Sequence, residues 1–512
     1  MPIKVFFRED IEFLERCAAL SGKNTEVLMY NAGKAVADFI LETLLENKKD
    51  KKLICILLGK GNNGGDGYVA ANILQGSGMK VSLIKLYGDP SATAAKNAMD
   101  NLAEGLTPIS FDEEKAKCEE LILKADVIVD AVFGFGFKGE CDLKLHRVSE
   151  LSKISSAVKV SVDIPSGCEC DSARVSKGAF KADYTLTFTA LKPALTEEPA
   201  ASYSGEVHIA SVGIDKNLVD SCPPAFTLID DSLVKSFIPK RKRDSNKGDF
   251  GRLLMICGTY SMAGACIMAA KAALRSGVGL LDIAISSDIY PIVAAAVPEA
   301  IFTVMNFDTE ESSVISSEKL FNSLNKASAV LIGCGLGQDA KKYLETVLRF
   351  SKCPIVLDAD ALNFTSENTD ILALASYPLV LTPHPGEMGR LIGKTASAVQ
   401  EDRYNIAKKF AMEHKVILCL KGSGTIVAMP DGEMHLNPTG NPGMAKGGSG
   451  DVLAGICASL LASGLKPEEA AIASVYVHGK AGDICAKELS QIAMLPTDII
   501  NKLPAVYKML EN

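Results

Sequence analysis

Short runs of apolar, often β-branched residues alternate with amphipathic segments along most of the chain. Runs that stay apolar without alternating with polar residues are typical of strands covered on both faces of a mainly parallel sheet. The first half therefore predicts a βαβ arrangement, preceded by helices over 9–46. The predicted strands of this half are 52–58, 81–87, 126–132, 158–164, 183–189 and 206–211.

The first series stops at "SCPPAF", where Pro223 and Pro224 can continue neither a helix nor a central strand. A second series follows and ends in helices that we expect to begin near Asp451 and Pro467. Because 512 residues exceed what one core usually organises, we predict two α/β domains of three layers each, 1–225 and 226–512. The strands predicted for the second domain are 252–257, 280–285, 329–333, 354–358, 379–381, 416–420 and 425–429.

Composition is that of an ordinary soluble globular protein, with 47% hydrophobic and 23% charged residues. A formal charge of −8 disfavours a broad surface for nucleic-acid phosphates, so we expect no nucleic-acid partner. The basic stretch "KRKR" at 240–243 has two interpretations, a localisation or nucleic-acid patch and a solvated linker beside an anionic site.

No run of eighteen apolar residues occurs, and charges interrupt every apolar run near the start, so we expect neither export nor a membrane partner. The fourteen cysteines are scattered without a C-x-x-C pair and mostly lie in apolar segments. Buried, reduced thiols in the cytoplasm are the favoured interpretation, ahead of disulfides or a zinc site.

The segment "GKGNNGGDG" at 59–67 follows a predicted strand and matches the pattern G-x-G-x-x-G. The next strand offers Lys85 and ends without the carboxylate that would hold the ribose of a dinucleotide. A second match, "GFGFKG" at 134–139, follows another strand of the same domain. We therefore interpret the two segments as two walls of one crevice at the carboxyl ends of a parallel sheet.

Polar side chains gather at the same predicted strand ends: Asn63, Asp66, Asp130, Asp163 and Ser166. Their oxygens are hard ligands, which an alkali or alkaline-earth cation prefers. A bound cation would also make a carboxylate tolerable beside a segment suited to phosphate. The alternative, that each Asp only caps a following turn, remains open.

The motifs "GKGNNGGDGYVAA", "DAVFGFG" and "VDIPSG" resemble the NAD(P)HX epimerase family over about residues 10–215. That family interconverts the two epimers of hydrated nicotinamide cofactors and uses potassium. The resemblance implies potassium ligands at Asn63, Asp130 and Ser166. It makes Asp163 a candidate acid/base, although a lone carboxylate could instead hold the ribose. The residues implied to contact the hydrated cofactor are Asn62, Asn63, Gly64, Gly65, Asp66, Gly134, Phe135, Gly136, Phe137, Lys138, Gly139, Glu140 and Asp163.

In the second half, "NPGMAKGGSGDVLAG" at 441–455 places four glycines and a serine before Asp451, which opens an apolar helix. Consecutive amides at a helix amino end bind anions, and Asp451 would there accept the proton of an attacking hydroxyl. A simple capping role for Asp451 is the alternative. Lys421 opens a glycine turn between two strands, and His384 stands between two prolines, either as a ligand contact or as a structural residue.

The motifs "KGDFGRLLMICGTYSMAGA", "GCGLG", "LDADALN", "TPHPGE" and "MAKGGSGDVLAG" resemble the NAD(P)H-hydrate dehydratase family of the ribokinase-like fold over about residues 230–505. The resemblance implies dehydration driven by ADP or ATP, assisted by Mg²⁺. It places the hydrated cofactor at Ala265, Gly335, His384 and Asp451. The nucleotide would contact Lys421, Gly422, Ser423, Gly424, Thr425, Asn441, Pro442, Gly443, Met444, Ala445, Lys446, Gly447, Gly448, Ser449 and Gly450.

The second half departs from the family pattern at Asn246, Cys257, Thr259 and Cys334, which concerns local loop geometry more than the reaction. Together the two resemblances imply a bifunctional repair enzyme for NADHX and NADPHX, which we expect to be a homo-oligomer. One alternative is a ribokinase-like kinase for a small alcohol with a nucleotide-binding first domain. Another is a first half that binds or senses nucleotides without catalysis.

Overall fold

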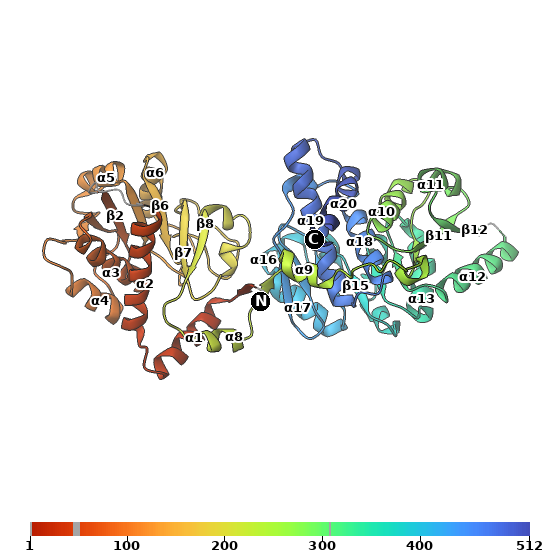
Figure 1. Ribbon diagram of the computed structural model, residues 1–512, viewed down its shortest axis with the longest axis horizontal. Coiled ribbons are helices and arrows are strands. Elements are labelled where there is room, and N and C mark those ends of the chain that lie inside the picture. The colour runs from red at the N-terminus through yellow and green to blue at the C-terminus, as the bar shows by residue number, and fades with distance from the viewer. Residues whose placement is uncertain (1–2, 45–51, 307–308, 512) are drawn as a thin grey trace. The chain divides into compact units, whose positions relative to one another are not determined.

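The structure of the chain is a computed structural model that describes residues 3–44, 52–306 and 309–511. Contacts divide the chain into two compact units, Lys4–Ala225 and Phe226–Asn512, and Ile3 groups with the second. Each unit is built around its own sheet with helices on both sides (Figure 1). The predicted α/β fold class is therefore confirmed.

The first unit holds a seven-stranded sheet in which all neighbouring strands are parallel. Every strand predicted for this half is present, within one or two residues at its ends. The additional strand, β4, has two residues, too few to show a pattern in the sequence. In sheet order the strands are β4 (Ile109–Ser110), β3 (Lys80–Lys85), β2 (Leu53–Leu58), β5 (Val127–Ala131), β6 (Val158–Val162), β7 (Tyr184–Phe188) and β8 (Glu206–Ala210).

Alternate residues of the central strand β2 enter two different cores. Ile54 and Ile56 pack with residues of α2 and α3, whereas Cys55 and Leu57 pack with residues of α5 and α6. The segment predicted as helical over 9–46 contains two α-helices and a π-helical turn, Ile40–Leu44, and its last two residues lie outside the described ones. The α-helices of the unit are α1 (Arg8–Leu20), α2 (Thr25–Phe39), α3 (Asn62–Gly76), α4 (Thr93–Asp100), α5 (Lys115–Lys124), α6 (Leu143–Ile154), α7 (Ala201–Ser204) and α8 (Lys216–Ser221).

The sheet of the second unit is parallel from β12 to β16 and antiparallel through β17 and β18. β9 then pairs in parallel with β18, and β1 (Ile3–Val5) precedes β9 at the edge. From β9 the sheet order is β9 (Phe226–Leu228), β18 (Met434–Asn437), β17 (Thr425–Ala428), β16 (Ile417–Leu420), β15 (Leu379–Leu381), β14 (Ile355–Leu357), β13 (Ala329–Ile332), β10 (Arg252–Ile256), β11 (Leu280–Ser286) and β12 (Ile301–Met305).

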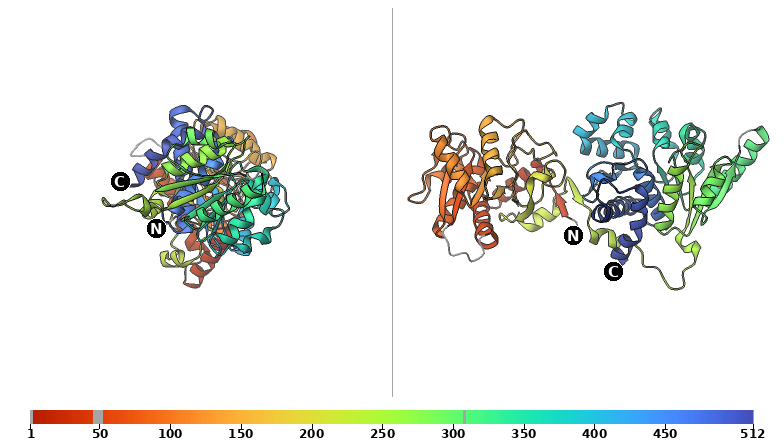
Figure 2. Two further views of the ribbon diagram at one scale, coloured as in Figure 1. Left: turned by 90° about the vertical axis from the view of Figure 1, so that its right-hand side faces the viewer. Right: turned by 90° about the horizontal axis from the view of Figure 1, so that it is seen from above.

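One core of this unit joins the sheet to α10, α18, α19 and α20. In the left view of Figure 2 the strands of the sheet run through the middle of the unit with helices on both sides. The helices predicted near Asp451 and Pro467 are α18 and α19. The α-helices of the unit are α9 (Asp231–Phe237), α10 (Ala263–Arg275), α11 (Tyr290–Ala296), α12 (Glu310–Leu324), α13 (Ala340–Phe350), α14 (Asp360–Thr365), α15 (Pro385–Leu391), α16 (Ala396–Glu401), α17 (Arg403–His414), α18 (Ser449–Ala462), α19 (Pro467–Leu489) and α20 (Pro496–Glu511).

Both sheets reverse their strand order once. β2 lies between β3 and β5, and β10 lies between β11 and β13. The strands that follow β2 or β10 in the chain are therefore added first on one side of it and later on the other side. Ligand crevices in open parallel sheets form at such switch points, outside the carboxyl ends of the strands. Each unit therefore offers one place where a binding site is expected.

All fourteen cysteines are unpaired thiols, and twelve of them are buried. Arg241 of the basic stretch at 240–243 stacks on the ring of Phe250 at 3.8 Å and donates to the carbonyl of Gly277 at 2.5 Å. Among the residues that the structure describes, none of the helices has the length and apolar character needed to cross a membrane.

Candidate functional site

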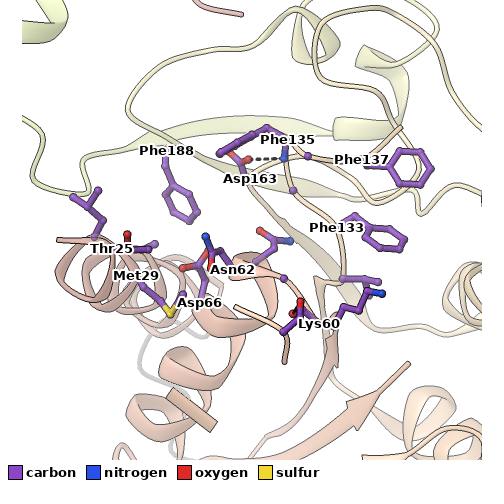
Figure 3. A pocket seen from close by; sticks show the side chains of 18 of the residues that line it. Thr25, Met29, Lys60, Asn62, Asp66, Phe133, Phe135, Phe137, Asp163 and Phe188 are labelled. Atoms are coloured by element: carbon purple, nitrogen blue, oxygen red, sulfur yellow. Dashed lines mark hydrogen bonds between the residues drawn. The ribbon is translucent and has the colours of Figure 1, made fainter. Parts of the chain in front are cut away.

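A cavity of about 680 Å³ opens at the switch point of the first sheet, between α2, the start of α3 and the segment after β5 (Figure 3). Polar and aromatic side chains share its wall, with Phe133, Phe135, Phe137 and Phe188 around the carboxylates of Asp66 and Asp163. Of the thirteen residues predicted to contact the hydrated cofactor, ten line this cavity: Asn62, Asn63, Asp66, Gly134, Phe135, Gly136, Phe137, Lys138, Glu140 and Asp163.

The other three predicted residues are glycines: Gly139 has a φ of +95° outside the cavity lining, whereas Gly64 and Gly65 are explained by packing. Gly64 and Gly65 lie inside helix α3, because that helix already begins at Asn62. A Cβ on Gly64 would lie 2.2 Å from the carbonyl oxygen of Gly59, and one on Gly59 would lie 1.9 Å from that of Val132. The glycines of this segment therefore let the helix approach the sheet closely.

The carboxylate of Asp163 is 4% exposed and is held from three directions. Lys192 donates to its Oδ1 at 2.6 Å, Thr187 donates to the same oxygen at 3.2 Å, and the backbone N–H of Phe135 donates to Oδ2 at 3.2 Å. Lys192 is itself 1% exposed and also donates to Thr187 and to the carbonyl of Phe188, both at 2.8 Å. A buried ammonium group thus fixes the candidate acid/base at the cavity wall.

Two further carboxyls face the same cavity without such a partner in the described part of the chain. Burial, and then the charges of Asp163 and Glu15, raise the pKa of Asp66 well above its ordinary value. Burial also raises the pKa of Glu15, which lies on α1. Asp163, Asp66 and Glu15 thus share one cavity in different electrostatic surroundings, since only Asp163 of these three has an ion-pair partner in the described residues.

Asp130 and Ser166 lie next to the cavity wall and form one hydrogen-bonded pair. Ser166 donates its hydroxyl to Asp130 Oδ1 at 2.6 Å and its N–H to Oδ2 at 2.8 Å, and Ser161 adds a bond to Oδ2 at 3.0 Å. Burial raises the pKa of Asp130, and these hydrogen bonds oppose that effect. Asn63 is 8% exposed, and its Nδ2 has no hydrogen-bond partner among the described residues.

In the second unit, Asp451 in the first turn of α18 approaches Asp358, the residue after β14. Lys421, after β16, donates to Asp358 Oδ1 at 3.0 Å. Burial lowers the pKa of Lys421, but the charges of Asp358 and Glu387 raise it by more. Burial, and then the charge of Asp358, raise the pKa of Asp451 to about 6. A carboxyl with this pKa is poised to accept a proton near neutral pH.

His384 caps helix α15, with its Nδ1 accepting from the N–H groups of Gly386 at 3.0 Å and Glu387 at 3.4 Å. Its Nε2 lies 3.4 Å from Glu387 Oε1, and burial lowers the pKa of the imidazole. Glu387 Oε2 lies 3.8 Å from the Lys421 ammonium group. His384 and Lys421 thus follow the neighbouring strands β15 and β16, and Asp451 lies in the first turn of α18. The predicted Ala265 and Gly335 touch each other beside β10 and β13.

The two glycine-rich segments of this unit frame the start of α18. Gly448 is its N-cap, with a φ of +100° that favours glycine, and a Cβ on Gly450 would lie 3.1 Å from Lys421 Nζ. The ammonium group of Lys421 therefore lies against the helix amino end. Ser449 Oγ and His478 Nε2 are buried there, without hydrogen-bond partners among the described residues. Helix amides with free polar atoms nearby suit an anionic ligand.

The remaining predicted nucleotide contacts belong to the segments on either side of this helix end. Arg403 donates to the carbonyls of Ser423 at 2.8 Å and Gly424 at 2.7 Å and so braces the turn from Lys421 to Thr425. Lys446 donates to the carbonyls of Ile492 and Met494, so its ammonium group supports the loop itself. In the second segment, Pro442–Met444 form a 3₁₀ turn, and Asn441 and Ala445 flank it.

Comparison with known proteins gives two family matches, one in each unit. Residues 253–505 match the family described as NAD(P)H-hydrate dehydratase, and residues 25–194 match the family described as YjeF-related protein N-terminus. A bifunctional NAD(P)H-hydrate repair enzyme of Moorella thermoacetica is 38% identical over 494 residues, which are 95% of this chain and 93% of that protein. The bifunctional NAD(P)H-hydrate repair enzyme of Coxiella burnetii is 35% identical to this chain over 98% of each chain.

The chain belongs to the bifunctional NAD(P)H-hydrate repair enzyme family. The family resemblance predicted from the motifs is therefore confirmed, and membership extends over both units. A ribokinase-like superfamily protein of Enterococcus faecalis V583 is similar in structure to part of the chain. It has a TM-score of 0.50 and 31% identity, and the match covers 56% of this chain and 98% of that one. The predicted ribokinase-like fold of the second half agrees with this likeness.

Several residues at the two family sites were missing from the sequence prediction. Lys192 had a weak signal, as a single lysine in the apolar stretch "TALKPAL". Asp358 and Glu387 stood inside quoted motifs but had no assigned role. Glu15 on an amphipathic helix and His478 within α19 gave no signal, because only the folded chain brings them to a site.

Proposed function

We propose that this chain repairs hydrated nicotinamide cofactors in two steps, one at each switch-point site. The first site interconverts the R and S forms of NADHX and NADPHX, and the second dehydrates the S form to NADH or NADPH with ADP or ATP. Membership of a family named for both steps supports this proposal across the whole chain. The unpaired cysteines suit a reducing compartment such as the cytoplasm.

At the first site Asp163 would move the proton as hydroxide leaves one face of the nicotinamide ring and returns to the other. Lys192 would hold this carboxylate at one position, so that it accepts and returns the proton from the same point. The phenylalanines of the cavity would cover the ring and limit access of bulk water. The aromatic wall and the single fixed carboxylate support an isomerisation more than a hydrolysis.

Asn63, Asp130 and Ser166 are the proposed ligands of potassium. Asp130 is 0% exposed, and it forms no ion pair with a lysine, arginine or histidine in the part of the chain that the structure describes. A cation bound there would compensate this buried charge, and the unpartnered amide of Asn63 could turn its oxygen toward it. When bound, potassium would supply a fixed positive charge beside the reacting hydroxide. These observations support the proposed ligands.

At the second site a phosphoryl group would pass from the nucleotide to the ring hydroxyl while Asp451 accepts the hydroxyl proton. The C–O bond then breaks, phosphate leaves with its electrons, and the ring nitrogen donates its lone pair to form the double bond. Loss of a proton from the neighbouring carbon completes the dehydration. Asp451 is suited to the first proton transfer because it is ionised at neutral pH yet still basic.

The nucleotide would lie along the turn from Lys421 to Thr425 and the segment from Asn441 to Gly450, with its phosphates at the amino end of α18. The ammonium group of Lys421 is the charge best placed to face those phosphates. Mg²⁺ fits this site because the carboxyls of Asp358, Asp451 and Glu387 carry more negative charge than the one ammonium group of Lys421 can balance. The phosphates would supply most of its ligands.

The single observation that carries the proposal is the position of Asp451, a half-buried carboxyl at a helix amino end beside Lys421, with a pKa raised to about 6. A kinase for a small alcohol would use a similar base but would release a stable phosphorylated product. Relatives named for hydrate repair cover more than nine tenths of the chain, which does not favour the kinase alternative.

The decisive test follows the absorbance of reduced nicotinamide when the epimeric mixture of NADHX is incubated with ADP or ATP, Mg²⁺ and K⁺. We expect Asp451→Asn to abolish recovery of both epimers. Asp163→Asn and Lys192→Met should recover only the S epimer, about half of a racemic mixture, because they lose the roughly 10²- to 10⁴-fold contribution of acid–base catalysis to epimerisation.

Each variant carries its own control, because the unchanged site of the same chain reports folding and concentration. Asp451→Asn should still interconvert the epimers, measured by chromatography, and Asp163→Asn should still dehydrate pure S epimer at the wild-type rate. Normal turnover by Asp451→Asn would show that another group is the base. Release of a stable phosphorylated product without NADH would favour the kinase.

A further inference from the structure

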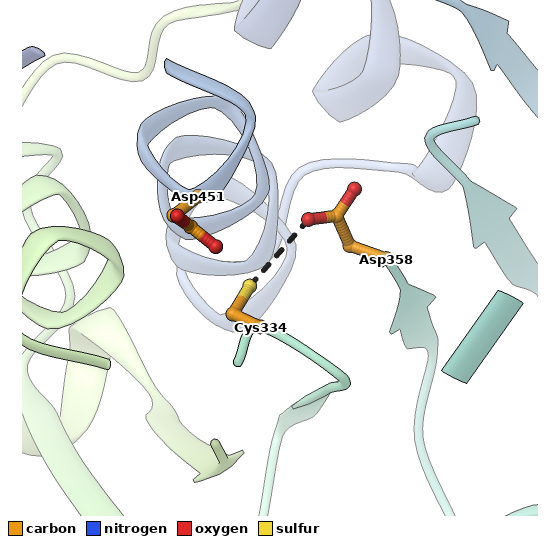
Figure 4. A group of neighbouring side chains, drawn as sticks. All are labelled: Cys334, Asp358 and Asp451. Carbon is orange, nitrogen blue, oxygen red and sulfur yellow. Dashed lines mark hydrogen bonds between the residues drawn. The ribbon is translucent and has the colours of Figure 1, made fainter. Parts of the chain in front are cut away.

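Three potential metal ligands, one thiol and two carboxyls, converge beneath the amino end of α18 (Figure 4). The thiol of Cys334 follows β13, Asp358 follows β14, and Asp451 lies on α18. One ligand atom from each lies within 4.8 Å of the others, and the Cys334 thiol donates to Asp358 Oδ2 at 3.6 Å. Ligand atoms of tetrahedral zinc are about 3.5 Å apart, since Zn–S and Zn–O bonds measure about 2.3 and 2.1 Å.

The two oxygens of Asp358 have separate surroundings. Oδ1 accepts from Lys421 at 3.0 Å and from Thr382 at 2.7 Å, whereas Oδ2 faces Cys334. A cation could therefore bind Oδ2 without displacing the ammonium group. The Lys421 ammonium group also lies 3.8 Å from Glu387 Oε2, so one positive charge faces the carboxylates of both Asp358 and Glu387. Negative charge is therefore in excess here.

Burial and access also meet the requirements of a metal site. Cys334 is 0% exposed and Asp358 1% exposed, and both are held by short connections after central strands, so two ligands are rigid. Asp451 is partly exposed, so a cation could reach the group from its side. Small rotations of the Asp451 and Cys334 side chains would suffice to close the ligand set.

We infer that Cys334, Asp358 and Asp451 form a binding site for a soft divalent cation such as Zn²⁺, and that a cation bound there blocks the second catalytic site. On binding, Cys334 releases its thiol proton to solvent and its sulfur bonds to the metal. Thiolate selects zinc over magnesium, which takes oxygen ligands, so the site differs from that of the Mg²⁺ bound with a nucleotide. Only the inhibition rests on the proposed function of Asp451.

The binding test uses Co²⁺ as a spectroscopic substitute for zinc, added to the full chain without nucleotide. We expect one Co²⁺ per chain and a thiolate-to-cobalt charge-transfer band in the near ultraviolet. Zn²⁺ should displace the band at stoichiometric concentration, whereas excess Mg²⁺ should leave it. Cys334→Ser, or Cys334→Ala if serine is poorly accommodated, should remove the band, and Asp451→Asn should weaken cobalt binding at least about tenfold.

Cys353→Ser provides the matched control, because Cys353 is also buried in this unit but lies outside the three-ligand group. It should keep both the band and its cobalt affinity. A band that persists in Cys334→Ser, for example from Cys168 and Cys170, would overturn the assignment, as would the absence of a band in the wild type.

Inhibition is measured separately, as NADH recovery from S-NADHX with saturating Mg²⁺ and micromolar Zn²⁺. Wild type should lose at least about nine tenths of its rate, and the ratio of rates with and without zinc should return to near one in Cys334→Ser. Cobalt binding that leaves the zinc-treated rate unchanged would overturn the inhibitory role while leaving the site. Failure of the dehydratase assay in the absence of zinc would instead concern the proposed function.

Discussion

Two carboxyls at strand or helix ends, the buried Asp163 and the half-buried Asp451, are given different properties by their neighbours. Asp163 has a buried ammonium group, Lys192, at 2.6 Å, which holds it in place with its charge compensated. Asp451 has no such partner in the described residues, and burial with the nearby Asp358 raises its pKa to about 6. Residue type alone would have made these two groups equivalent, so their chemistry depends on what the fold places beside them.

The raised pKa of Asp451 predicts the pH dependence of dehydration. Only the ionised carboxylate can accept the hydroxyl proton, so kcat/KM for S-NADHX should fall below a pH of about 6, about tenfold per pH unit. Because the pKa lies above its ordinary value, this loss should begin well above pH 4. Initial rates of NADH formation at saturating nucleotide and constant Mg²⁺ would measure it. A midpoint near pH 4 would contradict the burial of Asp451 in the free enzyme.

In each unit a helix begins at the proposed site, and glycines allow that helix to pack closely against neighbouring backbone. α18 is buried along nearly its whole length, and a Cβ on its Gly455 would lie 2.2 Å from the carbonyl oxygen of Ala269 in α10. The same device holds α3 against the first sheet at Gly64. In both units the glycines thus set the position of the helix whose first turns carry a site carboxyl, Asp451 or Asp66.

Gly455→Ala should therefore disturb both stability and activity of the second unit. Since backbone atoms cannot yield as a flexible side chain would, we expect overpacking to lower the free energy of unfolding by about 1–3 kcal/mol. The dehydratase rate should fall as well, because α18 carries Asp451. Thermal unfolding and S-NADHX turnover would measure the two effects.

Gly264→Ala is the matched control for this change. Gly264 lies in α10, and an added Cβ would meet nothing within 4 Å. This substitution should leave the free energy of unfolding unchanged or raise it by about 0.4–1 kcal/mol, because alanine reduces the freedom of the unfolded chain. Equal losses in both variants would show that the contact with Ala269 is not the cause.

At the scale of the whole molecule, each unit has its own sheet, core and site. Each proposed reaction can therefore be completed by residues of a single unit, and hydrate released by one site can be taken up by the other. The order of the two reactions is set by chemistry, since the dehydratase is proposed to use only one epimer.

Two variants that each lack one of the two activities should accordingly complement each other in solution. A mixture of Asp163→Asn and Asp451→Asn chains should convert all of the racemic NADHX to NADH, because hydrate epimerised by one chain diffuses to the other. The final NADH absorbance, compared with wild type at equal concentration, measures this recovery. Recovery limited to about half would show that hydrate must pass between the two sites of one chain, because freely diffusing hydrate would reach both kinds of chain.

The amino-acid sequence by itself determined the α/β class, nearly every central strand and the family, because buried parallel strands and glycine-rich turns leave local patterns in the chain. Ten of the thirteen residues that it predicted for the first site line the first cavity. Tertiary structure alone decided the partners: Lys192 for Asp163, Glu15 beside Asp66, and Cys334 with Asp358 beneath Asp451. These pairs come from segments far apart in sequence, and charge compensation depends on distances through space, which local patterns do not record.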